Sequence, residues 1–226
     1  DPKPRLSITP ATQIVCEGVA TTMTLSSSTV PSAGTIRFTK ISAVPTGGMT
    51  LTSAPKTIYV NGEQIGDVWD NPTTLAQTVT YTFRASVVGG LGCISEDITA
   101  LLTVNPSPNV VASAQAPICS SDFINITLTP DVANTICNYT VTPPSVISGA
   151  TSGAGNLIFQ TLFYNSATPT VANSDGPVTV NYTVTPRANN CNGPQLVIPV
   201  VVNPKPKILP LPNTFTICHG NTLTIP

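Results

Sequence analysis

Strict alternation of apolar and polar residues over two segments predicts half-buried β-strands. Residues 78–83 place a Val, a Tyr and a Phe between three threonines, and residues 178–184 alternate four apolar side chains with Thr and Asn. Because successive side chains of a strand point to opposite faces, each segment offers one face to a core and the other to solvent. Shorter apolar runs predict further strands at residues 23–25, 36–38, 98–104, 124–128, 136–141, 157–164 and 196–202.

Turn residues separate these strands, and no long segment has the 3.6-residue period of an amphipathic helix. The chain contains 23 Pro and 15 Gly, which favour turns. About seven short strands in about 100 residues are typical of a Greek-key sandwich of immunoglobulin type. An antibody domain is excluded, because the first cysteine of each unit precedes the second strand and no Trp occupies the third. The sequence therefore predicts an all-β protein of antiparallel, immunoglobulin-like sandwiches.

A short proline-rich phrase occurs three times in the chain. It reads Asp1-Pro-Lys-Pro, Asn105-Pro-Ser-Pro and Asn203-Pro-Lys-Pro, so the copies lie 104 and 98 residues apart. A cysteine follows each copy at a similar distance, and another precedes each of the later two copies by 12 residues. A period of about one small domain is the signature of a tandem array. We expect sandwich repeats arranged head to tail, with repeat 1 at residues 1–104, repeat 2 at 105–202 and the start of a truncated third repeat at 203–226.

We interpret the proline-rich phrase as a joint between repeats. Proline fixes its own φ and restricts the residue before it, so such a joint is semi-rigid. Too few residues follow the third copy to bury a core, and we expect the natural polypeptide to continue past Pro226. The joint prolines are Pro106, Pro108, Pro204 and Pro206.

The six cysteines predict disulfides in an oxidising compartment, because the chain has no close cysteine pair and no histidine cluster for a metal. The preferred pairing lies within each repeat, Cys16 with Cys93 and Cys119 with Cys191. Each bond would close a loop of about 75 residues and stabilise by about 4 kcal/mol. The rival pairing joins Cys16 to Cys191 across the joint, because the bottom of one sandwich meets the top of the next. Two cysteines have no assigned partner: Cys137 and Cys218.

The charge balance limits the classes of partner. The chain has nine Lys and Arg against ten Asp and Glu, and the basic residues are scattered. Nucleic acids and anionic membranes bind through clusters of Lys and Arg, so neither is an expected partner. The longest apolar run, residues 196–202, is too short to span a membrane and contains Pro199.

Candidate catalytic residues are few. The single histidine, His219, occupies a turn position that holds Glu17 in repeat 1 and Ser120 in repeat 2, which is not expected of a catalytic group. We therefore expect no catalytic residue, metal ligand or cofactor, and no enzymatic activity.

Trp69 is the one site of ambiguous chemistry. Glu63, Asp67 and Asp70 surround it in the sequence, and carboxylates beside an exposed Trp would suit a sugar- or calcium-binding loop. The alternative, which we prefer, is an irregular crossover with Trp69 as a core side chain.

Three motifs near the end of repeat 2 carry a family resemblance. They are Val-Asn-Tyr-Thr-Val-Thr-Pro at 180–186, Ala-Asn-Asn-Cys-Asn-Gly-Pro at 188–194 and Val-Val-Val-Asn-Pro-Lys-Pro at 200–206. Their order and period resemble the PKD-like repeats of giant surface proteins of gliding Bacteroidetes. Repeat 1 departs from the pattern, with Val-Val-Gly-Gly-Leu-Gly-Cys at 87–93 and an unusual crossover at 56–71.

The resemblance implies a cell-surface adhesin of gliding motility, exported by the type 9 secretion system and moved along the outer membrane by a motor. Its expected partners are neighbouring repeats of the same polypeptide, surface polysaccharide or other adhesin copies, and the secretion and gliding machinery. The expected function is a non-catalytic, adhesive stalk. The alternative is a spacer or carbohydrate-binding module of a secreted carbohydrate-active enzyme, which would need an exposed aromatic platform.

Overall fold

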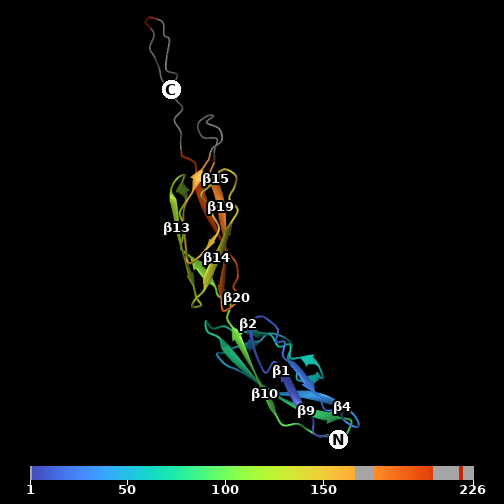
Figure 1. The fold of residues 1–226 in the computed structure, drawn as a ribbon. Helices are drawn as coiled ribbons and strands as arrows, with labels where there is room; N and C mark the ends of the chain where they lie inside the picture. Colours follow the sequence, from blue (N-terminus) through green and yellow to red (C-terminus); the bar gives the residue numbers. More distant parts are fainter. Residues whose placement is uncertain (1, 166–175, 206–218, 221–226) are drawn as a thin grey trace.

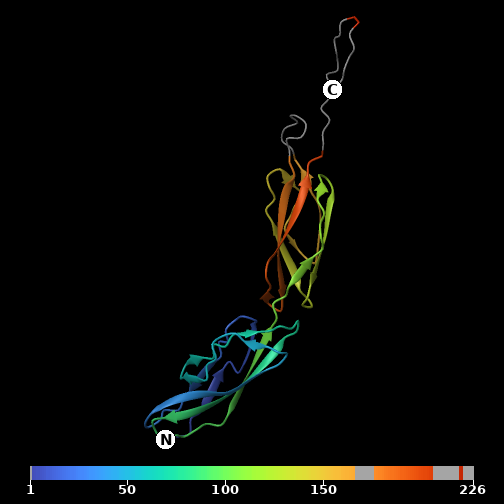
Figure 2. The ribbon, with the colours of Figure 1, turned by 180° about the vertical axis from the view of Figure 1, so that it is seen from behind.

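Two β-sandwiches follow one another along the chain and lie end to end (Figure 1). The structure, a computed structural model, describes residues 2–165, 176–205 and 219–220. Within those residues every regular element is a strand. Seen from behind, the two bodies again meet only through their ends (Figure 2). The all-β fold class predicted from the alternation is confirmed.

The first sandwich is built from β1 to β10. One sheet has the order β1-β3-β7, and the facing sheet has the order β2-β10-β9-β4-β6. A further two-stranded sheet is formed by β5 and β8. The bounds are β1 Leu6–Thr9, β2 Thr12–Cys16, β3 Thr24–Ser27, β4 Thr35–Pro45, β5 Thr50–Leu51, β6 Ile58–Val60, β7 Glu63–Gln64, β8 Trp69–Asp70, β9 Gln77–Val88 and β10 Ile98–Asn105.

The second sandwich repeats this plan with β11 to β21. Its sheets have the orders β11-β13-β17 and β12-β21-β19-β14-β16; β20 also pairs with β19, and β15-β18 form a small pair. The bounds are β11 Val110–Ala112, β12 Ile118–Cys119, β13 Phe123–Pro130, β14 Ile136–Val141, β15 Ile147–Ser148, β16 Gly153–Ala154, β17 Leu157–Thr161, β18 Phe163–Tyr164, β19 Val178–Ala188, β20 Cys191–Asn192 and β21 Leu196–Asn203.

Each sandwich has its own core between its two sheets. Alternation places the core correctly in the central strands: in β9, Val79, Tyr81 and Phe83 are fully buried, and Tyr182 of β19 is buried in the same way. In β14 the inward positions are those of Cys137 and Tyr139, whereas Ile136 faces solvent.

One expected strand is divided. Residues 157–164 form β17 and β18, which belong to different sheets. Leu162, between them, is fully buried and marks the point where the chain crosses from one sheet to the other. The predicted third repeat lies outside the described residues except for residues 203–205 and 219–220.

A parallel edge strand is the feature of this topology that positions the joint. The chain forms β1 in one sheet, crosses over, and forms β2 beside β10 in the other sheet. β2 runs parallel to β10, and Cys16 is level with Asn105, the last residue of β10. The first cysteine of the repeat is therefore carried to the end of the sandwich where the chain leaves it.

Candidate functional site: the joint between the sandwiches

Cys16 is held at the joint by backbone hydrogen bonds. The amide N of Glu17 donates to the carbonyl O of Asn105 at 2.9 Å, and the amide N of Gly18 donates to the carbonyl O of Trp69 at 3.0 Å. These bonds continue the β2–β10 pairing by one residue and then turn the chain away. The backbone position of Cys16 is thus fixed relative to the end of β10.

Cys191 reaches the joint on a tight hairpin of the second sandwich. Ala188 of β19 pairs with Cys191 of β20, and only Asn189 and Asn190 lie between them. Both asparagines have positive φ, 49° and 65°. This is the conformation of a two-residue type I′ turn, and asparagine adopts it more readily than most residues. The hairpin end faces the first sandwich, and Cys191 is fully buried there.

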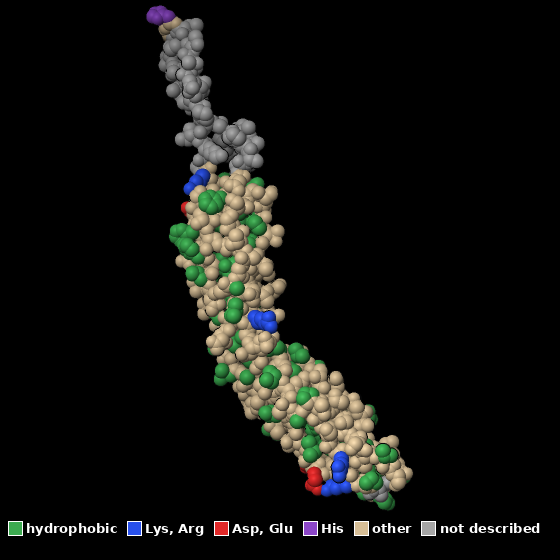
Figure 3. Space-filling model, in the orientation of Figure 1, with side chains coloured by type: hydrophobic (Ala, Val, Ile, Leu, Met, Phe, Trp, Pro, Cys, Tyr) green, Lys and Arg blue, Asp and Glu red, His purple; other side chains and the backbone are tan. Residues whose placement is uncertain are grey.

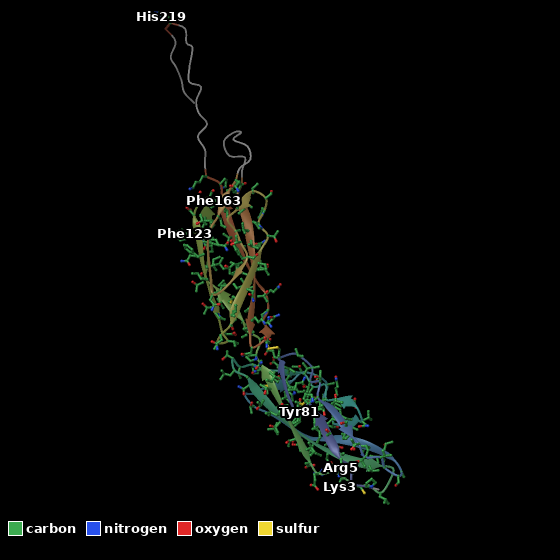
Figure 4. All side chains as sticks on the ribbon, viewed as in Figure 1. Lys3, Arg5, Tyr81, Phe123, Phe163 and His219 are labelled. Carbon is green, nitrogen blue, oxygen red and sulfur yellow. A yellow bond between two sulfur atoms is a disulfide. The ribbon has the colours of Figure 1, made fainter. Side chains whose placement is uncertain are left out.

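A disulfide joins Cys16 to Cys191 and links the two sandwiches (Figure 4). The preferred pairing within repeats, Cys16 with Cys93 and Cys119 with Cys191, is therefore wrong, and the cross-joint pairing is the one observed. The physical reason is distance. The eight residues of β10 span about 24 Å, and Cys93 precedes that strand whereas Cys16 lies beside its last residue. Bonded cysteines need Cα atoms within about 7 Å, so the two ends of one sandwich cannot be bridged.

The linker between the sandwiches is packed against the same hairpin. Pro106 and Pro108 are buried between β10 and β11. The side-chain N of Asn105 donates to the carbonyl O of Asn189 at 3.3 Å. A Cβ on Gly193 would lie 1.6 Å from the carbonyl O of Pro108, so only glycine permits this approach. The joint is thus held by a covalent bond, a hydrogen bond and backbone contact.

The other candidate joint residues fall after β21 or beyond the description. Pro204 follows β21 and is half-buried, whereas Pro206 and Cys218 lie outside the described residues. Cys93 is half-buried in the loop between β9 and β10. Cys137 is fully buried in the second core, where desolvation raises the pKa of its thiol. Cys119 is exposed at the far end of the second sandwich.

Trp69 is a core side chain, as preferred from the sequence. It is 5% exposed, and its indole N donates to the Tyr81 hydroxyl at 2.7 Å. Asp67 beside it is buried and accepts from the Lys40 ammonium at 2.7 and 2.9 Å. Burial raises the pKa of Tyr81, and the negative charge of Asp67 adds to the rise. Trp69 therefore offers no platform for a sugar.

The remaining acidic residues near Trp69 are dispersed. Glu63 pairs with Lys56 at the surface, which lowers the pKa of its carboxyl, and Asp70 is exposed. Among the residues that the structure describes, no group of three His, Cys, Asp or Glu side chains could hold a metal ion. His219 is exposed.

Charged side chains gather at the end of the first sandwich farthest from the joint (Figure 3). Lys3 pairs with Glu96, and Arg84 pairs with Asp97 at 2.6 and 2.8 Å. These pairs line a shallow hollow beside Ser95. The joint itself has no such ion pair among the described residues, so the two ends of the first sandwich differ in character.

The sequence reasoning missed an exposed aromatic pair on the second sandwich. Phe123 of β13 and Phe159 of β17 are 58% and 59% exposed, with ring centroids 5.3 Å apart. Phe163 of β18 is also exposed (Figure 4). The signal was present in β13, where Phe123 alternates with the buried isoleucines and so must face outward.

The described residues contain no helix long and apolar enough to cross a membrane. Residues 116–206, which cover most of the second sandwich, match the family model of the PKD-like domain. No curated protein sequence matches the chain. An immunoglobulin-like repeat is the description that the fold and this match support, and such domains are generally non-catalytic modules of extracellular proteins.

Several solved structures are similar over most of the chain. The fibronectin(III)-like modules of Clostridium thermocellum CbhA show 14% identity and a TM-score of 0.30, covering 88% of this chain and 95% of theirs. The human mucin-like protocadherin EC1-2 shows 11% identity and 0.30, with 90% and 99% covered. The D00-D0 domain of intimin shows 14% identity and 0.28, with 86% and 98% covered. At these TM-scores the likeness carries no argument about function.

Proposed function

We propose that this chain is a segment of a non-catalytic stalk in a cell-surface adhesin of the gliding-motility type. Ig-like and PKD-like domains are typical of extracellular adhesion and stalk modules. The observation that carries the proposal is the disulfide between Cys16 and Cys191, because it joins two separately folded sandwiches end to end. In this proposal the segment is exported by the type 9 secretion system and stays associated with the outer membrane surface.

The disulfide gives the joint a second path for tension. Force applied at the two ends of the chain reaches Cys16 and then crosses directly to Cys191. The 175-residue interval between these cysteines, which includes most of both cores, lies outside that path. A stalk built this way keeps its length even when a sandwich opens. A catalytic domain gains nothing from such an arrangement, whereas an extended support does.

The partners proposed for the stalk follow from its surface. Repeats before and after it in the same polypeptide would contact its ends, where the joint residues lie. Surface polysaccharide or other adhesin copies would contact its sides, which are rich in uncharged Thr and Ser and would bind weakly at many points. Contact with the secretion and gliding machinery is proposed from the resemblance to gliding-motility adhesins alone.

Pulling the chain by its ends tests the mechanical role. With the disulfide intact, the length released on unfolding is expected to be shorter by about 600 Å than in the reduced chain, because 175 residues at about 3.4 Å each stay closed. The double variant Cys16→Ser, Cys191→Ser should behave like the reduced chain. Cys119→Ser is the matched control and should leave the release unchanged. Equal release from oxidised and reduced chains would contradict the proposal.

Labelling intact cells of the source organism tests the location. Antibodies raised against the folded chain should bind the cell surface, and the signal should disappear when the type 9 secretion system is disabled. Gliding cells should also move bound antibody-coated beads along their surface. Signal found only in lysed cells would contradict the surface role.

The exposed Phe123–Phe159 pair supports one second candidate, a carbohydrate-binding surface. Exposed aromatic rings are the usual apolar contact for a sugar face, and the cross-strand partners Asn125 of Phe159 and Thr161 of Phe123 supply polar neighbours on the same face. Pull-down on insoluble polysaccharides with Phe123→Ser, Phe159→Ser and a matched Val111→Ser control separates the candidates. Binding lost only in the phenylalanine variants would favour the module.

A further inference from the structure

The surroundings of Cys119 repeat those of Cys16, the cysteine that bridges the observed joint. β12 runs parallel to β21, with Cys119 level with Asn203, as Cys16 is level with Asn105. The amide N of Ser120 donates to the carbonyl O of Asn203 at 2.9 Å, the same distance as the bond from Glu17 to Asn105. Cys119 is therefore fixed at the leaving end of the second sandwich as Cys16 is at the leaving end of the first.

The turn after each cysteine is also the same. The second residue after the cysteine, Gly18 or Ser121, has a φ of 73° in both sandwiches. The amide N of this residue donates to a backbone carbonyl O in the same sandwich. The acceptor is Trp69 at 3.0 Å in the first sandwich and Leu162 at 2.7 Å in the second. A serine in this left-handed conformation is uncommon. The second sandwich thus keeps the geometry even where its sequence does not favour it.

Neither other described cysteine of the second sandwich can reach Cys119. Cys137 is enclosed in the core, and Cys191 is bonded to Cys16 at the opposite end. Cys119 itself is exposed and carries a thiol. The linker phrase that follows β10 at the observed joint also follows β21, as Asn203-Pro-Lys-Pro.

We propose that Cys119 bonds to the hairpin cysteine of the repeat that follows, at the position that Cys191 has in the second sandwich. The occupant of this end is thus another sandwich of the same polypeptide, entered through the Asn203 linker. This disulfide goes beyond the stalk function, because it concerns how successive repeats are linked. It does not depend on what the stalk binds.

The consequence is a series of overlapping disulfides. Cys119 lies between Cys16 and Cys191 in the sequence, so the loop closed at the next joint begins inside the loop closed at this one. Opening one sandwich then does not separate its neighbours, because each loop overlaps the next and the disulfides still bridge the joints. Independent disulfides inside each repeat would leave every joint free to bend.

The bond forms by a balanced two-electron oxidation. The two cysteine thiols lose two protons and two electrons as their Sγ–Sγ bond forms. A disulfide oxidant, such as oxidised glutathione or a thiol oxidoreductase in its disulfide form, accepts them and leaves as two thiols. No other group is transferred.

A chain with one repeat duplicated tests the proposal. Residues 1–202 are followed directly by residues 105–226, which preserves the Val-Asn-Pro-Ser-Pro linker, and Cys218→Ser removes one competing thiol. The protein is refolded with a glutathione redox couple, alkylated, digested without reduction and mapped. The expected product links Cys119 of the first copy to Cys191 of the second copy, and alkylation of the first-copy Cys119 falls at least about tenfold relative to the 226-residue chain.

Two variants make the outcome decisive. Cys119→Ser in the first copy should leave Cys191 of the second copy open to alkylation, whereas Cys137→Ser should leave the new bond intact. The Cys16 to first-copy Cys191 peptide, found in the same digest, shows that the original joint has folded. Given that peptide, an alkylated first-copy Cys119, or one bonded to a second molecule, overturns the proposal.

Discussion

The two sandwiches share one plan but fill their centres differently. The first buries an ion pair, Lys40 with Asp67, whose side chains are 9% and 2% exposed, next to the Trp69–Tyr81 hydrogen bond. The second has a core of aliphatic and aromatic residues with the Cys137 thiol. Within the described part of the chain, all four ion pairs belong to the first sandwich.

The two sandwiches are most alike at the end where the chain exits each one, beside the last residue of β10 or β21. Cys16 and Cys119 sit beside the last residue of the final strand with matching backbone hydrogen bonds. A core tolerates different solutions provided that its volume is filled and its polar groups are paired. A joint has to present one fixed geometry to its neighbour. The comparison therefore separates residues that build a repeat from residues that connect repeats.

The largest expected effect comes from removing the disulfide between the two sandwiches. The double variant Cys16→Ser, Cys191→Ser should lose about 5 kcal/mol when both sandwiches unfold, because the closed loop spans 175 residues. The sandwiches should then unfold independently. Trp69, the single Trp of the chain, reports on the first by fluorescence, and alkylation of the buried Cys137 reports on the second.

Denaturant titrations of the oxidised and variant chains make this measurement. If the two probes already separate in the oxidised chain and do not shift in the variant, the disulfide does not couple the sandwiches. Cys119→Ser again serves as the control, since it removes a thiol without touching the bond.

The next effect tests the first core alone. Lys40→Met leaves Asp67 charged and buried without a partner, which should cost about 3–5 kcal/mol in the free energy of unfolding. When it is made in the Cys16→Ser, Cys191→Ser chain, where the sandwiches unfold independently, the Trp69 transition should move to lower denaturant and Cys137 protection should stay as it was. Lys56→Met removes a surface partner of Glu63 and should change stability by less than about 1 kcal/mol. If Lys40→Met costs as little stability as Lys56→Met, the first core does not depend on its buried ion pair.

A smaller effect is expected at the close contact in the joint. Gly193→Ala places a Cβ against the backbone of Pro108, which cannot yield as a side chain would, and should cost about 1–3 kcal/mol. The first sandwich has Ser95 at the corresponding place, two residues after its cysteine. Gly176→Ala is the matched control, because a Cβ there meets no atom within 4 Å. Thermal unfolding, followed by Cys137 alkylation, should separate the two alanine variants.

The sequence predicted the sandwiches better than the joint. Strands such as β9 and β19 were found because one face must be buried and the other wetted, which leaves a period of two. The Lys40–Asp67 pair left no such signal, since its members are 27 residues apart and lie on different segments. Cysteine spacing alone favoured pairing within repeats. The parallel β2–β10 register, which carries Cys16 to the far end from Cys93, decides against it and is not visible as a local pattern.

The finest comparison sets Tyr81 against Tyr182, which occupy the central strands β9 and β19. Tyr81→Phe leaves the buried indole N–H of Trp69 without its acceptor, and an unsatisfied buried donor costs about 1–3 kcal/mol. The Tyr182 hydroxyl donates to Oε1 of Gln160, but that oxygen also accepts from the amide N of Thr151, so it stays bonded in Tyr182→Phe. Burial raises the pKa of Tyr182 to about 12, so both hydroxyls are neutral at ordinary pH and charge does not confuse the comparison. The stability reported by Trp69 fluorescence should fall clearly in Tyr81→Phe. The stability reported by Cys137 alkylation should fall by less than about 1 kcal/mol in Tyr182→Phe. Equal losses of stability in the two variants would mean that the Trp69–Tyr81 hydrogen bond matters no more to the first sandwich than the Tyr182–Gln160 bond does to the second.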